Sequence, residues 1–291
     1  MLLGVDVGGT FTDAVLVNNG IIIKQAKVKT TQEEVLQGIL QALDIVLSGN
    51  ELDAISRVVV SSTIVTNALT EGKTEPVFLA VMAGPGMSTK GRFPTEPYLA
   101  EGYVDHRGQI IKKASVNEKI VEAMAAGKAV AAVSGKFAVR NQKNEQDLRV
   151  KLKETGFKKI FMGSEISGEL NFVRRTNSAY FSAAVYNKFK EFIGQVEDSV
   201  RSRGITAQVQ ILKADGGTIT LAAALEQPVE AVFTGPAASV LGIEALDAPS
   251  VNAISLDVGG TTTDIAFWSC GSPLLANRGA KIAGYPTAVR A

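Results

Sequence analysis

The chain has 291 residues, of which 46% are hydrophobic and 20% charged, the composition of a globular protein with ample material for a core. Its 30 basic residues nearly balance its 29 acidic ones, so the charge gives no reason to expect nucleic acid or an anionic membrane as a partner. One cysteine, Cys270, excludes an internal disulfide, and with one histidine, His106, a zinc site of the usual His/Cys kind is excluded too.

The start of the chain and its apolar runs indicate a cytoplasmic protein. Met1 leads directly into a predicted strand without a basic leader region, and no apolar run approaches the roughly 20 residues of a membrane helix. Cys270 is expected to be buried or half-buried, and a lone cysteine fits a reducing compartment. His106 lies in a polar, turn-like segment, which favours a surface loop over a catalytic base.

The first predicted element is a hairpin with a polar tip. Residues 6–13 read DVGGTFTD and lie between two apolar runs, which predicts a strand, a Gly-Gly turn and a second strand. Near the C-terminus, residues 257–264 read DVGGTTTD, with seven of the eight positions identical and with similar apolar flanks. One such hairpin would be ordinary, but two near-identical copies favour a functional reason.

The chemistry that fits this tip is phosphate binding. Adjacent glycines allow positive φ angles and remove the side chains that would keep a phosphate from backbone N–H groups. Threonine hydroxyls add donors, and the leading aspartate offers a hard oxygen to Mg²⁺ or to its bound waters.

After the first hairpin, the pattern predicts a third strand over 21–28, a helix over 35–46 and a buried strand over 58–60. Thr30 or Thr31 would cap the helix, with Glu33 and Glu34 in its first turn and 49–50 at its end. The hydroxyl-rich segment 61–69 has two open interpretations. It is either a capped helix start or a helix N-terminus that faces a binding cleft.

The region 77–165 alternates predicted strands and helices, which makes it α/β. The strands are expected over 77–81, 129–133 and 160–162, and the helices over 117–126 and 144–155. Its glycine-rich stretch 84–93 lacks the Gly-Lys-[Ser/Thr] of a Walker loop and is interpreted as a turn or mobile loop.

The later part of the chain predicts one or two amphipathic helices over 176–202 and a strand over 209–213. A helix is expected near 236–242, with Pro236 in its first turn and small residues that permit close approach to another helix.

Several of these motifs together resemble the hydantoinase A and 5-oxoprolinase family, within the actin, sugar-kinase and Hsp70 ATPase superfamily. Besides the two hairpins, the matching stretches are 61–73 (SSTIVTNALTEGK), 163–169 (GSEISGE), 174–176 (RRT), 214–217 (ADGG), 228–242 (PVEAVFTGPAASVLG) and 284–286 (GYP). Gln227 and Thr234 stand where Arg and Ser are common in the family.

The resemblance implies an α/β fold with one RNase H-like lobe over 1–250, an α/β insertion at about 77–165, and the start of a second RNase H-like lobe over 251–291. The matching pattern stops before the family's adenosine-binding segments, so a truncated chain is expected, inactive alone and binding Mg·ATP no tighter than about millimolar.

The resemblance also implies a site for ATP and Mg²⁺ between the two hairpins. Asp6 and Asp257 would hold Mg²⁺ through water, and one of Asp6, Asp13 and Asp257 would be the catalytic base, without a choice among them. The expected nucleotide-binding residues are Gly8, Gly9, Thr10, Phe11, Thr12, Gly235, Gly259, Gly260, Thr261, Thr262 and Thr263. Glu165 and Arg175 are expected on the substrate side.

The implied activity is ATP-dependent hydrolysis of a cyclic amide, such as a hydantoin or 5-oxoproline, through phosphorylation of the amide oxygen. A second, hydantoinase B-type subunit is the expected partner, and neither nucleic acid nor a membrane is. The alternatives are an ATP-responsive regulatory protein of the actin or Hsp70 type and a subunit of an ATP-dependent ketone carboxylase.

Overall fold

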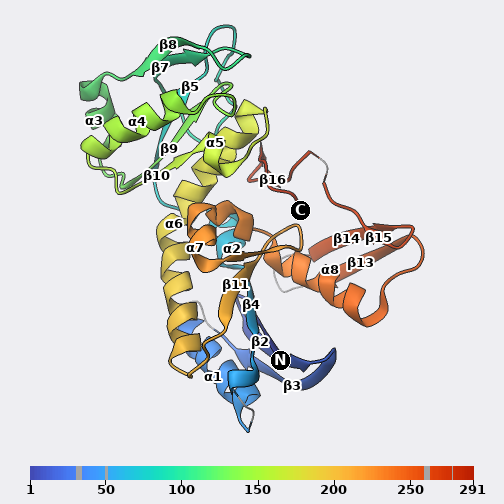
Figure 1. The fold of residues 1–291 in the computed structure, drawn as a ribbon. Coiled ribbons are helices and arrows are strands. Elements are labelled where there is room, and N and C mark those ends of the chain that lie inside the picture. Colours follow the sequence, from blue (N-terminus) through green and yellow to red (C-terminus); the bar gives the residue numbers. More distant parts are fainter. Residues whose placement is uncertain (31–34, 50–51, 259–262, 277) are drawn as a thin grey trace.

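A six-stranded mixed sheet forms the lower half of the molecule (Figure 1). The computed structural model describes residues 1–30, 35–49, 52–258, 263–276 and 278–291. The strand order is β12-β11-β4-β1-β2-β3, with β1, β2 and β3 antiparallel and with β4 and β11 parallel to β1. The strands are β1 (Leu2–Val7), β2 (Phe11–Asn18), β3 (Ile21–Lys29), β4 (Arg57–Ser62), β11 (Gln208–Leu212) and β12 (Thr218–Thr220).

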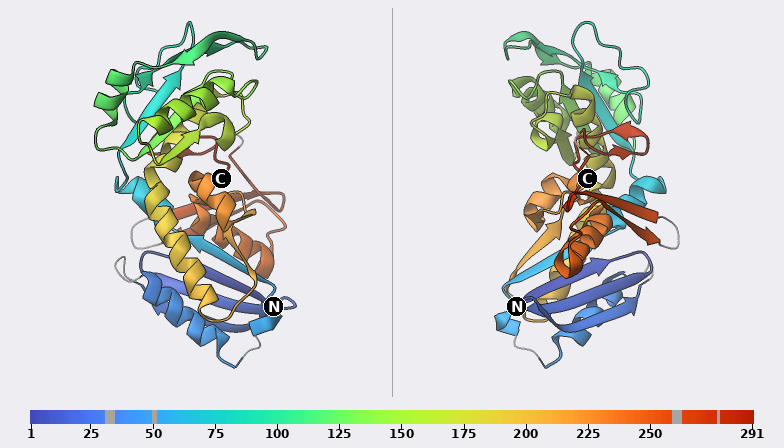
Figure 2. Two further views of the ribbon diagram at one scale, coloured as in Figure 1. Left: turned by 60° about the vertical axis from the view of Figure 1, so that its left-hand side comes forward. Right: turned by 90° about the vertical axis from the view of Figure 1, so that its right-hand side faces the viewer.

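Alternating side chains explain why these strands bury one face. Leu3, Val5 and Val7 of β1 are buried, and so are Ala14 and Leu16 of β2. This face packs against α1 (Val35–Leu47) and α6 (Phe172–Arg201), as Figure 2 shows from two sides. Side chains of the same strands with the opposite parity point to the other face, where the candidate site lies.

A second, parallel sheet forms the upper half, in the order β10-β9-β5-β6. Its two faces are covered differently: α6 lies on one, and α3 and α4 lie on the other. A β7–β8 hairpin flanks it. The elements are β5 (Val77–Met82), β6 (Tyr98–Leu99), β7 (Glu101–Val104), β8 (Ile110–Ser115), α3 (Glu118–Ala125), β9 (Val130–Gly135), α4 (Lys143–Glu154), β10 (Lys159–Met162) and α5 (Gly163–Ile166).

Helix α6 joins the two halves as one uninterrupted helix of 30 residues. It begins at Asn171, whose side chain accepts a hydrogen bond from the Arg174 N–H at 3.2 Å. Phe189 and Phe192 lie on the buried side of α6, and one continuous apolar core follows this side along both sheets. The mixed α/β fold thus has a single long helix as the common wall of its two sheets.

The C-terminal part begins with α8 (Thr234–Asp247), which lies beside the first sheet and carries a second hairpin (Figure 1). The remaining elements are α2 (Ile64–Thr70), α7 (Leu221–Glu226), β13 (Ala253–Val258), β14 (Thr263–Ser269), β15 (Ser272–Pro273), β16 (Lys281–Ile282) and β17 (Tyr285–Pro286), with 3₁₀ turns at Leu52–Ala54 and Pro228–Ala231. The Ala288 N–H donates to Ser178 Oγ at 2.9 Å, so the last residues pack against α6.

One sequence-based expectation about this region was wrong. Cys270 is exposed, because it occupies the turn after β14 with a φ of 48°. Helix α8 contacts strands β4, β11 and β14, and Phe233 just before it donates its N–H to Thr66 of α2. The expected capping and helix-end residues Thr31, Glu33, Glu34 and Asn50 lie outside the described residues.

Among the residues that the structure describes, no helix is both long enough and apolar enough to cross a membrane.

Candidate functional site

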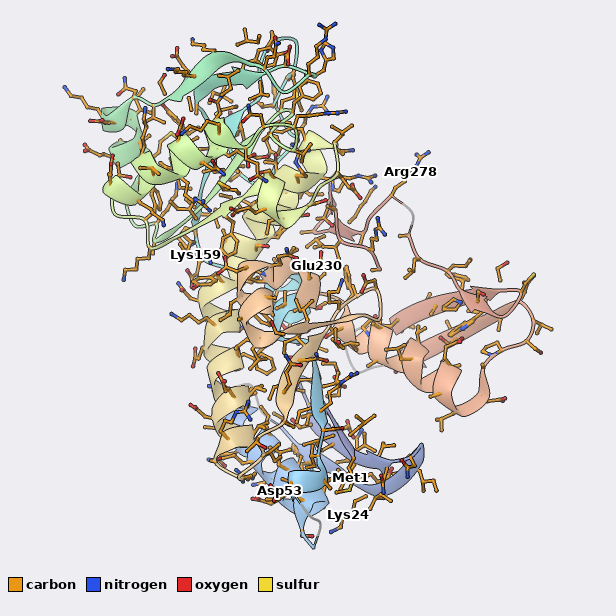
Figure 3. The ribbon with its side chains drawn as sticks, viewed as in Figure 1. Met1, Lys24, Asp53, Lys159, Glu230 and Arg278 are labelled. Atoms are coloured by element: carbon orange, nitrogen blue, oxygen red, sulfur yellow. The ribbon has the colours of Figure 1, made fainter. Side chains whose placement is uncertain are left out.

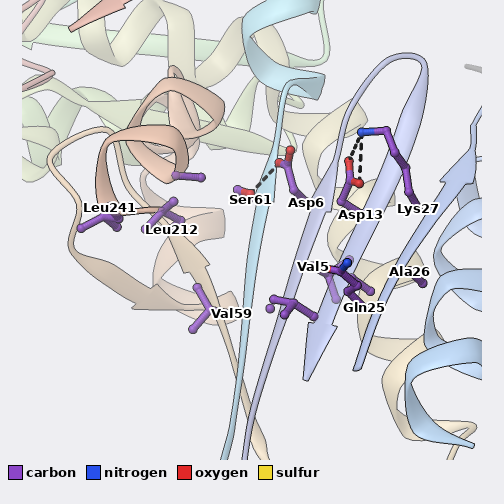
Figure 4. A pocket seen from close by; sticks show the side chains of 14 residues that line it. Val5, Asp6, Asp13, Gln25, Ala26, Lys27, Val59, Ser61, Leu212 and Leu241 are labelled. Atoms are coloured by element: carbon purple, nitrogen blue, oxygen red, sulfur yellow. Dashed lines mark hydrogen bonds and ion pairs between the residues drawn. The ribbon is translucent and has the colours of Figure 1, made fainter. Parts of the chain in front are cut away.

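A row of four polar side chains crosses the open face of the first sheet (Figure 4). Asp6 of β1 lies directly between Ser61 of β4 and Asp13 of β2 in the strand register, and Asp13 pairs in turn with Lys27 of β3. Because side chains at paired positions project to the same face, the sheet itself brings these residues together. The predicted Asp6 and Asp13 are therefore cross-strand neighbours.

Each carboxylate in this row has one polar partner. Ser61 Oγ donates to Asp6 Oδ1 at 2.6 Å, and Lys27 Nζ lies 3.2 Å from both carboxylate oxygens of Asp13. Burial raises the pKa of the Asp6 carboxyl above its usual value, while the Ser61 hydrogen bond opposes this. The charges of Asp13 and Asp257 raise this pKa further, and that of Lys27 lowers it.

The second hairpin repeats the arrangement of the first. Asp257 of β13 pairs with Asp264 of β14, as Asp6 pairs with Asp13. Ser239 Oγ of α8 donates to Asp257 Oδ2 at 3.0 Å, and burial, followed by the Asp257 charge, raises the pKa of Asp264. The Asp257 charge also raises the pKa of Asp6, so the leading aspartates of the two hairpins lie within electrostatic range of each other.

The tip of the first hairpin requires glycine for a steric reason and not for a positive φ angle. Neither Gly8 nor Gly9 has a positive φ, so that expectation was wrong. The requirement at Gly8 is steric: an added Cβ would lie 2.8 Å from the Phe11 carbonyl oxygen, which accepts the Gly8 N–H at 2.9 Å. Gly9 and Thr10 are exposed, with only the Asn67 amide 3.4 Å from a Cβ placed on Gly9.

The threonines and Phe11 differ in what they offer a ligand. Thr12 faces the core, and its hydroxyl lies 2.6 Å from that of Thr30, so it is not the free hydroxyl that the sequence suggested. Phe11 is exposed beneath Lys27, whose Nζ lies 5.0 Å from the ring centroid. Thr263 is exposed at the start of β14. The expected binding residues Gly259, Gly260, Thr261 and Thr262 lie outside the described residues.

The start of α8 is fastened to the end of β4. Thr234 Oγ1 donates to the Ser62 carbonyl and accepts the Ser62 N–H, both at 2.9 Å. Phe233 precedes the helix with a φ of 56° and donates its N–H to Thr66 Oγ1 at 3.0 Å. The first turn of α8, including Gly235, therefore lies against the segment 61–69, for which a functional role was left open.

An open pocket of about 720 Å³ lies over this face of the sheet. The polar row forms one end of it, and Ala238 and Leu241 of α8 line the opposite side. Val59 of β4 and Gln25 of β3 form its floor (Figure 4). The carboxylates of Asp6 and Asp13 are thus reachable by a ligand of substantial size.

Glu165 and Arg175 do not meet in a substrate site here. Arg175 is completely buried, and its guanidinium donates to the carbonyls of Gly135 and Glu169 at 2.9 and 2.5 Å. Glu165 instead forms an ion pair with Arg149 at 2.9 Å. The expectation that Arg175 faces a substrate fails because its side chain stabilises the junction between α6 and the second sheet.

A divalent cation would find few direct ligands. Within the described residues, no three His, Cys, Asp or Glu side chains converge on one point. Burial is the main cause of the raised pKa of Asp6, and the negative charges of Asp13 and Asp257 raise this pKa further. A hydrated cation between them, held through its waters, fits this arrangement.

Comparison with known families decides the relationship. The model of the hydantoinase/oxoprolinase N-terminal region matches residues 2–156, and the hydantoinase/oxoprolinase model matches residues 175–291. The chain belongs to the hydantoinase/oxoprolinase family.

One protein of known sequence and two solved structures are similar to this chain. The gamma subunit of acetophenone carboxylase from Aromatoleum aromaticum is 25% identical, over 91% of this chain and 42% of its own length. The nucleotide-free structure of an acetone carboxylase superposes with a TM-score of 0.83 and 19% identity, over all of this chain and 46% of its own. The ATP-dependent caprolactamase from Pseudomonas jessenii gives a TM-score of 0.69 and 20% identity, over 92% and 43%. This chain thus spans less than half the length of each of these relatives.

The structure adds two residues to the site that the sequence did not indicate, Lys27 and Ser239, which contact Asp13 and Asp257. It also gives a place to Ser61, the first residue of the segment 61–69 whose role was left open, because β4 pairs with β1 and sets Ser61 beside Asp6. No sequence signal indicated Lys27 or Ser239, because both depend on strand register and on how α8 docks.

Proposed function

We propose that this chain forms the phosphate-binding part of an ATP-dependent enzyme that opens a cyclic amide. The observation that carries the proposal is the repeated hairpin, which places Asp6 with Asp13 and Asp257 with Asp264 in the same register. The polyphosphate of ATP would lie between the two hairpins, and the family to which the chain belongs supports ATP use.

Asp6 and Asp257 would hold Mg²⁺ through its water ligands, and the ion would supply charge neutralisation for the transferred phosphoryl group. The exposed backbone of Gly9 and Thr10 would donate N–H groups to phosphate oxygens, together with the tip of the second hairpin. Gly235 would allow the first turn of α8 to approach the same ligand. Asp6, Asp13 and Asp257 remain the three candidates for the base.

The six-stranded sheet is assigned to an RNase H-like lobe. Three antiparallel strands at one side, followed by β4 and β11 parallel to β1, are the pattern expected for that lobe. In this assignment, residues 77–165 are an insertion into the first lobe, and β13 and β14 begin the second.

The proposed reaction overcomes the low reactivity of a ring amide. Transfer of the γ-phosphoryl group of ATP to the amide oxygen releases ADP and makes the ring carbon a better electrophile. A first water then attacks that carbon and the C–N bond breaks, with the nitrogen taking up a proton, which leaves an acyl phosphate. A second water hydrolyses the acyl phosphate to a carboxylate and free phosphate. The caprolactamase among the structural neighbours acts on a ring amide with ATP, which supports this substrate class.

A second candidate is the carboxylation of a ketone with ATP. The acetone carboxylase structure and the acetophenone carboxylase subunit favour it, and the latter is one subunit of an assembly. In both cases, we expect a second subunit of the hydantoinase B type and a cytoplasmic location.

One assay separates these functions. The intact protein, purified with its partner subunit, is given Mg·ATP alone, with hydantoin or 5-oxoproline, or with acetone and bicarbonate, and ADP release is measured. The proposal requires ADP release that depends on a ring amide. Dependence on ketone and bicarbonate would transfer the assignment to a carboxylase, and ADP release with neither would indicate an ATP-responsive regulatory protein.

A further inference from the structure

A second polar pocket, of about 480 Å³, lies apart from the row of aspartates. Four segments line it: the loop after α5, the turn after β11, the 3₁₀ turn at Pro228–Ala231 and the residues just before the C-terminus. Figure 3 labels Glu230 of this pocket at the waist of the molecule, between the two sheets. Two motifs of the sequence that the proposed phosphate site does not use, 214–217 and 228–230, contribute residues to this pocket.

The turn after β11 holds Lys213 and Asp215 in place. The Lys213 N–H donates to the Gly217 carbonyl at 2.8 Å, and Gly216 makes the turn possible with a φ of 81°. Asp215 Oδ1 accepts the Gly217 N–H at 3.0 Å, while Asp215 Oδ2 accepts from Lys213 Nζ at 2.9 Å. The backbone thus fixes a lysine and its carboxylate partner at the pocket wall.

The 3₁₀ turn fixes Glu230 opposite them. Val229 is completely buried and donates its N–H to Ser182 Oγ of α6 at 3.4 Å, which anchors the turn. The Glu230 N–H donates to the Gln227 carbonyl at 3.0 Å. A binding group placed by a rigid turn loses little freedom when a ligand arrives.

Lys213 and Glu230 form a donor and an acceptor that face each other at a long contact distance. Lys213 Nζ lies 3.6 Å from Glu230 Oε2, beyond ordinary hydrogen-bond length. Among the described residues, Lys213 is the one cation within ion-pair distance of Glu230. Burial raises the pKa of Glu230, the Lys213 and Arg290 charges oppose that shift, and the Asp215 charge adds to it.

The pocket lies at the same edge of the sheet as the phosphate hairpin. Strands β1, β4 and β11 are parallel neighbours, so the residues that follow them reach one common edge. Leu212, the last residue of β11, lines the pocket beside Asp6, and Lys213 follows it directly. The two pockets therefore share this edge of the sheet.

We propose that Lys213 and Glu230 bind the amide of an uncharged ring substrate, with Lys213 donating to its carbonyl oxygen and Glu230 accepting from its N–H. A small ring forces the amide into the cis form, in which N–H and C=O lie on the same side and can meet one donor and one acceptor together. Ile166 and Ala288 offer apolar contact to the ring methylenes. This inference deepens the proposed function and depends on its substrate class.

The charges around the pocket select against an anionic ring. Glu169, Asp215 and Glu230 outnumber Lys213 and Arg290, and Lys213 is already paired with Asp215. An excess of negative charge disfavours a carboxylate-bearing ligand. A neutral lactam or hydantoin should therefore bind better than 5-oxoproline.

The test measures binding of δ-valerolactam to the 291-residue chain by NMR titration, without ATP. Glu230→Gln should weaken binding at least about tenfold, because a neutral amide oxygen replaces the charged acceptor and an amide NH₂ replaces the second carboxylate oxygen. Glu226→Gln is the matched control: it also removes a carboxylate paired with a lysine, Lys159, but outside the pocket, and binding should not change.

A comparison of ligands tests the proposal without any variant. N-Methyl-δ-valerolactam lacks the N–H, the open-chain N-methylacetamide prefers the trans form, and 5-oxoproline is anionic; each should bind at least about tenfold more weakly than δ-valerolactam. Equal binding of the N-methyl ring, equal binding by a folded Glu230→Gln variant, or no binding by the wild-type chain would overturn the pocket assignment. ADP release in the intact protein tests the proposed function separately. The pocket assignment and the proposed function can therefore fail independently.

Discussion

The position of Asp6 in the sheet disfavours the charged form of its carboxyl group. Its folded pKa lies above the unfolded value of about 3.9, mainly because the side chain is largely buried. The folded state therefore binds the Asp6 proton more tightly than the unfolded state does. Protonated Asp6 therefore increases the free energy of unfolding at low pH. This contribution to stability is lost as the pH rises through the folded pKa. An ionised Asp6 thus costs stability at neutral pH, which is typical of a functional residue.

We predict that Asp6→Asn in the intact protein keeps or slightly raises the melting temperature at pH 7, because it removes this charge. ADP release should fall at least about 100-fold, the scale of a lost charge-stabilising group. Thermal melts at pH 5 and pH 7 check the first part, and the stability gain should shrink at pH 5. Asp53→Asn, at an exposed site on the base of the molecule (Figure 3), is the control. A large loss of melting temperature with activity retained would contradict the assignment.

The two glycines of the first hairpin should respond differently to substitution. Gly8→Ala would push a methyl group to 2.8 Å from the Phe11 carbonyl and should lower the free energy of unfolding by about 1–3 kcal/mol. Gly9→Val has room in the folded chain and should change it by no more than about 0.5 kcal/mol, yet obstruct the approach of a phosphate. Denaturant melts and Mg·ATP titration of the intact protein distinguish them. Normal nucleotide binding by Gly9→Val, or by Gly260→Val at the corresponding position of the second hairpin, would rule out the phosphate-loop interpretation.

At the scale of elements, the junction between α6 and the second sheet depends on a buried polar network. Glu145 of α4 accepts the Gly135 N–H at 2.6 Å and the Ser164 hydroxyl at 2.5 Å. Burial raises the pKa of Glu145, and the nearby Arg175 charge opposes that shift. Arg175 in turn holds the Gly135 carbonyl, so strand β9, α4 and α6 meet at these residues.

Arg175→Leu should therefore destabilise the protein by about 1–3 kcal/mol, because it leaves the carbonyls of Gly135 and Glu169 without their donor. Arg174→Leu, at the neighbouring and partly exposed position, should cost less than about 1 kcal/mol. Urea unfolding of both variants is the measurement. Equal costs for the two would show that the network contributes nothing specific.

Sequence patterns predicted the hairpins, α1 and most strands of the second sheet, because apolar periodicity and turn residues are local signals. The sequence also contained a local signal that was not used. Thr12 alternates in step with Ala14 and Leu16 along β2, which places its side chain in the core. The burial of Arg175 carried no such signal, since a charged residue on a helix is ordinarily exposed and its partners lie on other elements.

At the scale of the whole molecule, the described strands of the second hairpin are only weakly embedded. Ile254, Leu256 and Val258 of β13 are exposed, whereas Trp268 of β14 is only 3% exposed. The Trp268 indole N–H donates to Glu244 of α8. Trp268 is the single tryptophan of the chain, so its fluorescence reports how β14 docks on α8.

We predict that the Trp268 emission of the 291-residue chain shifts to longer wavelength at lower urea concentration than the far-UV circular dichroism changes. The reason is that a hairpin with few buried contacts opens before the shared core of the sheets. Glu244→Ala should move the fluorescence midpoint to still lower urea and leave the dichroism midpoint in place. Coincident transitions in the wild-type chain would show instead that the hairpin unfolds together with the core.

Helix α6 has a mechanical consequence. Its 30 residues span about 45 Å as a single rod, and both sheets are packed along it. Rotation of one sheet relative to the other would require α6 to bend or to lose its packing against the core. Motion that closes the molecule around a ligand should therefore leave the two sheets in fixed orientation and displace α8 with β13 and β14, the elements that lie beside the rod rather than on it.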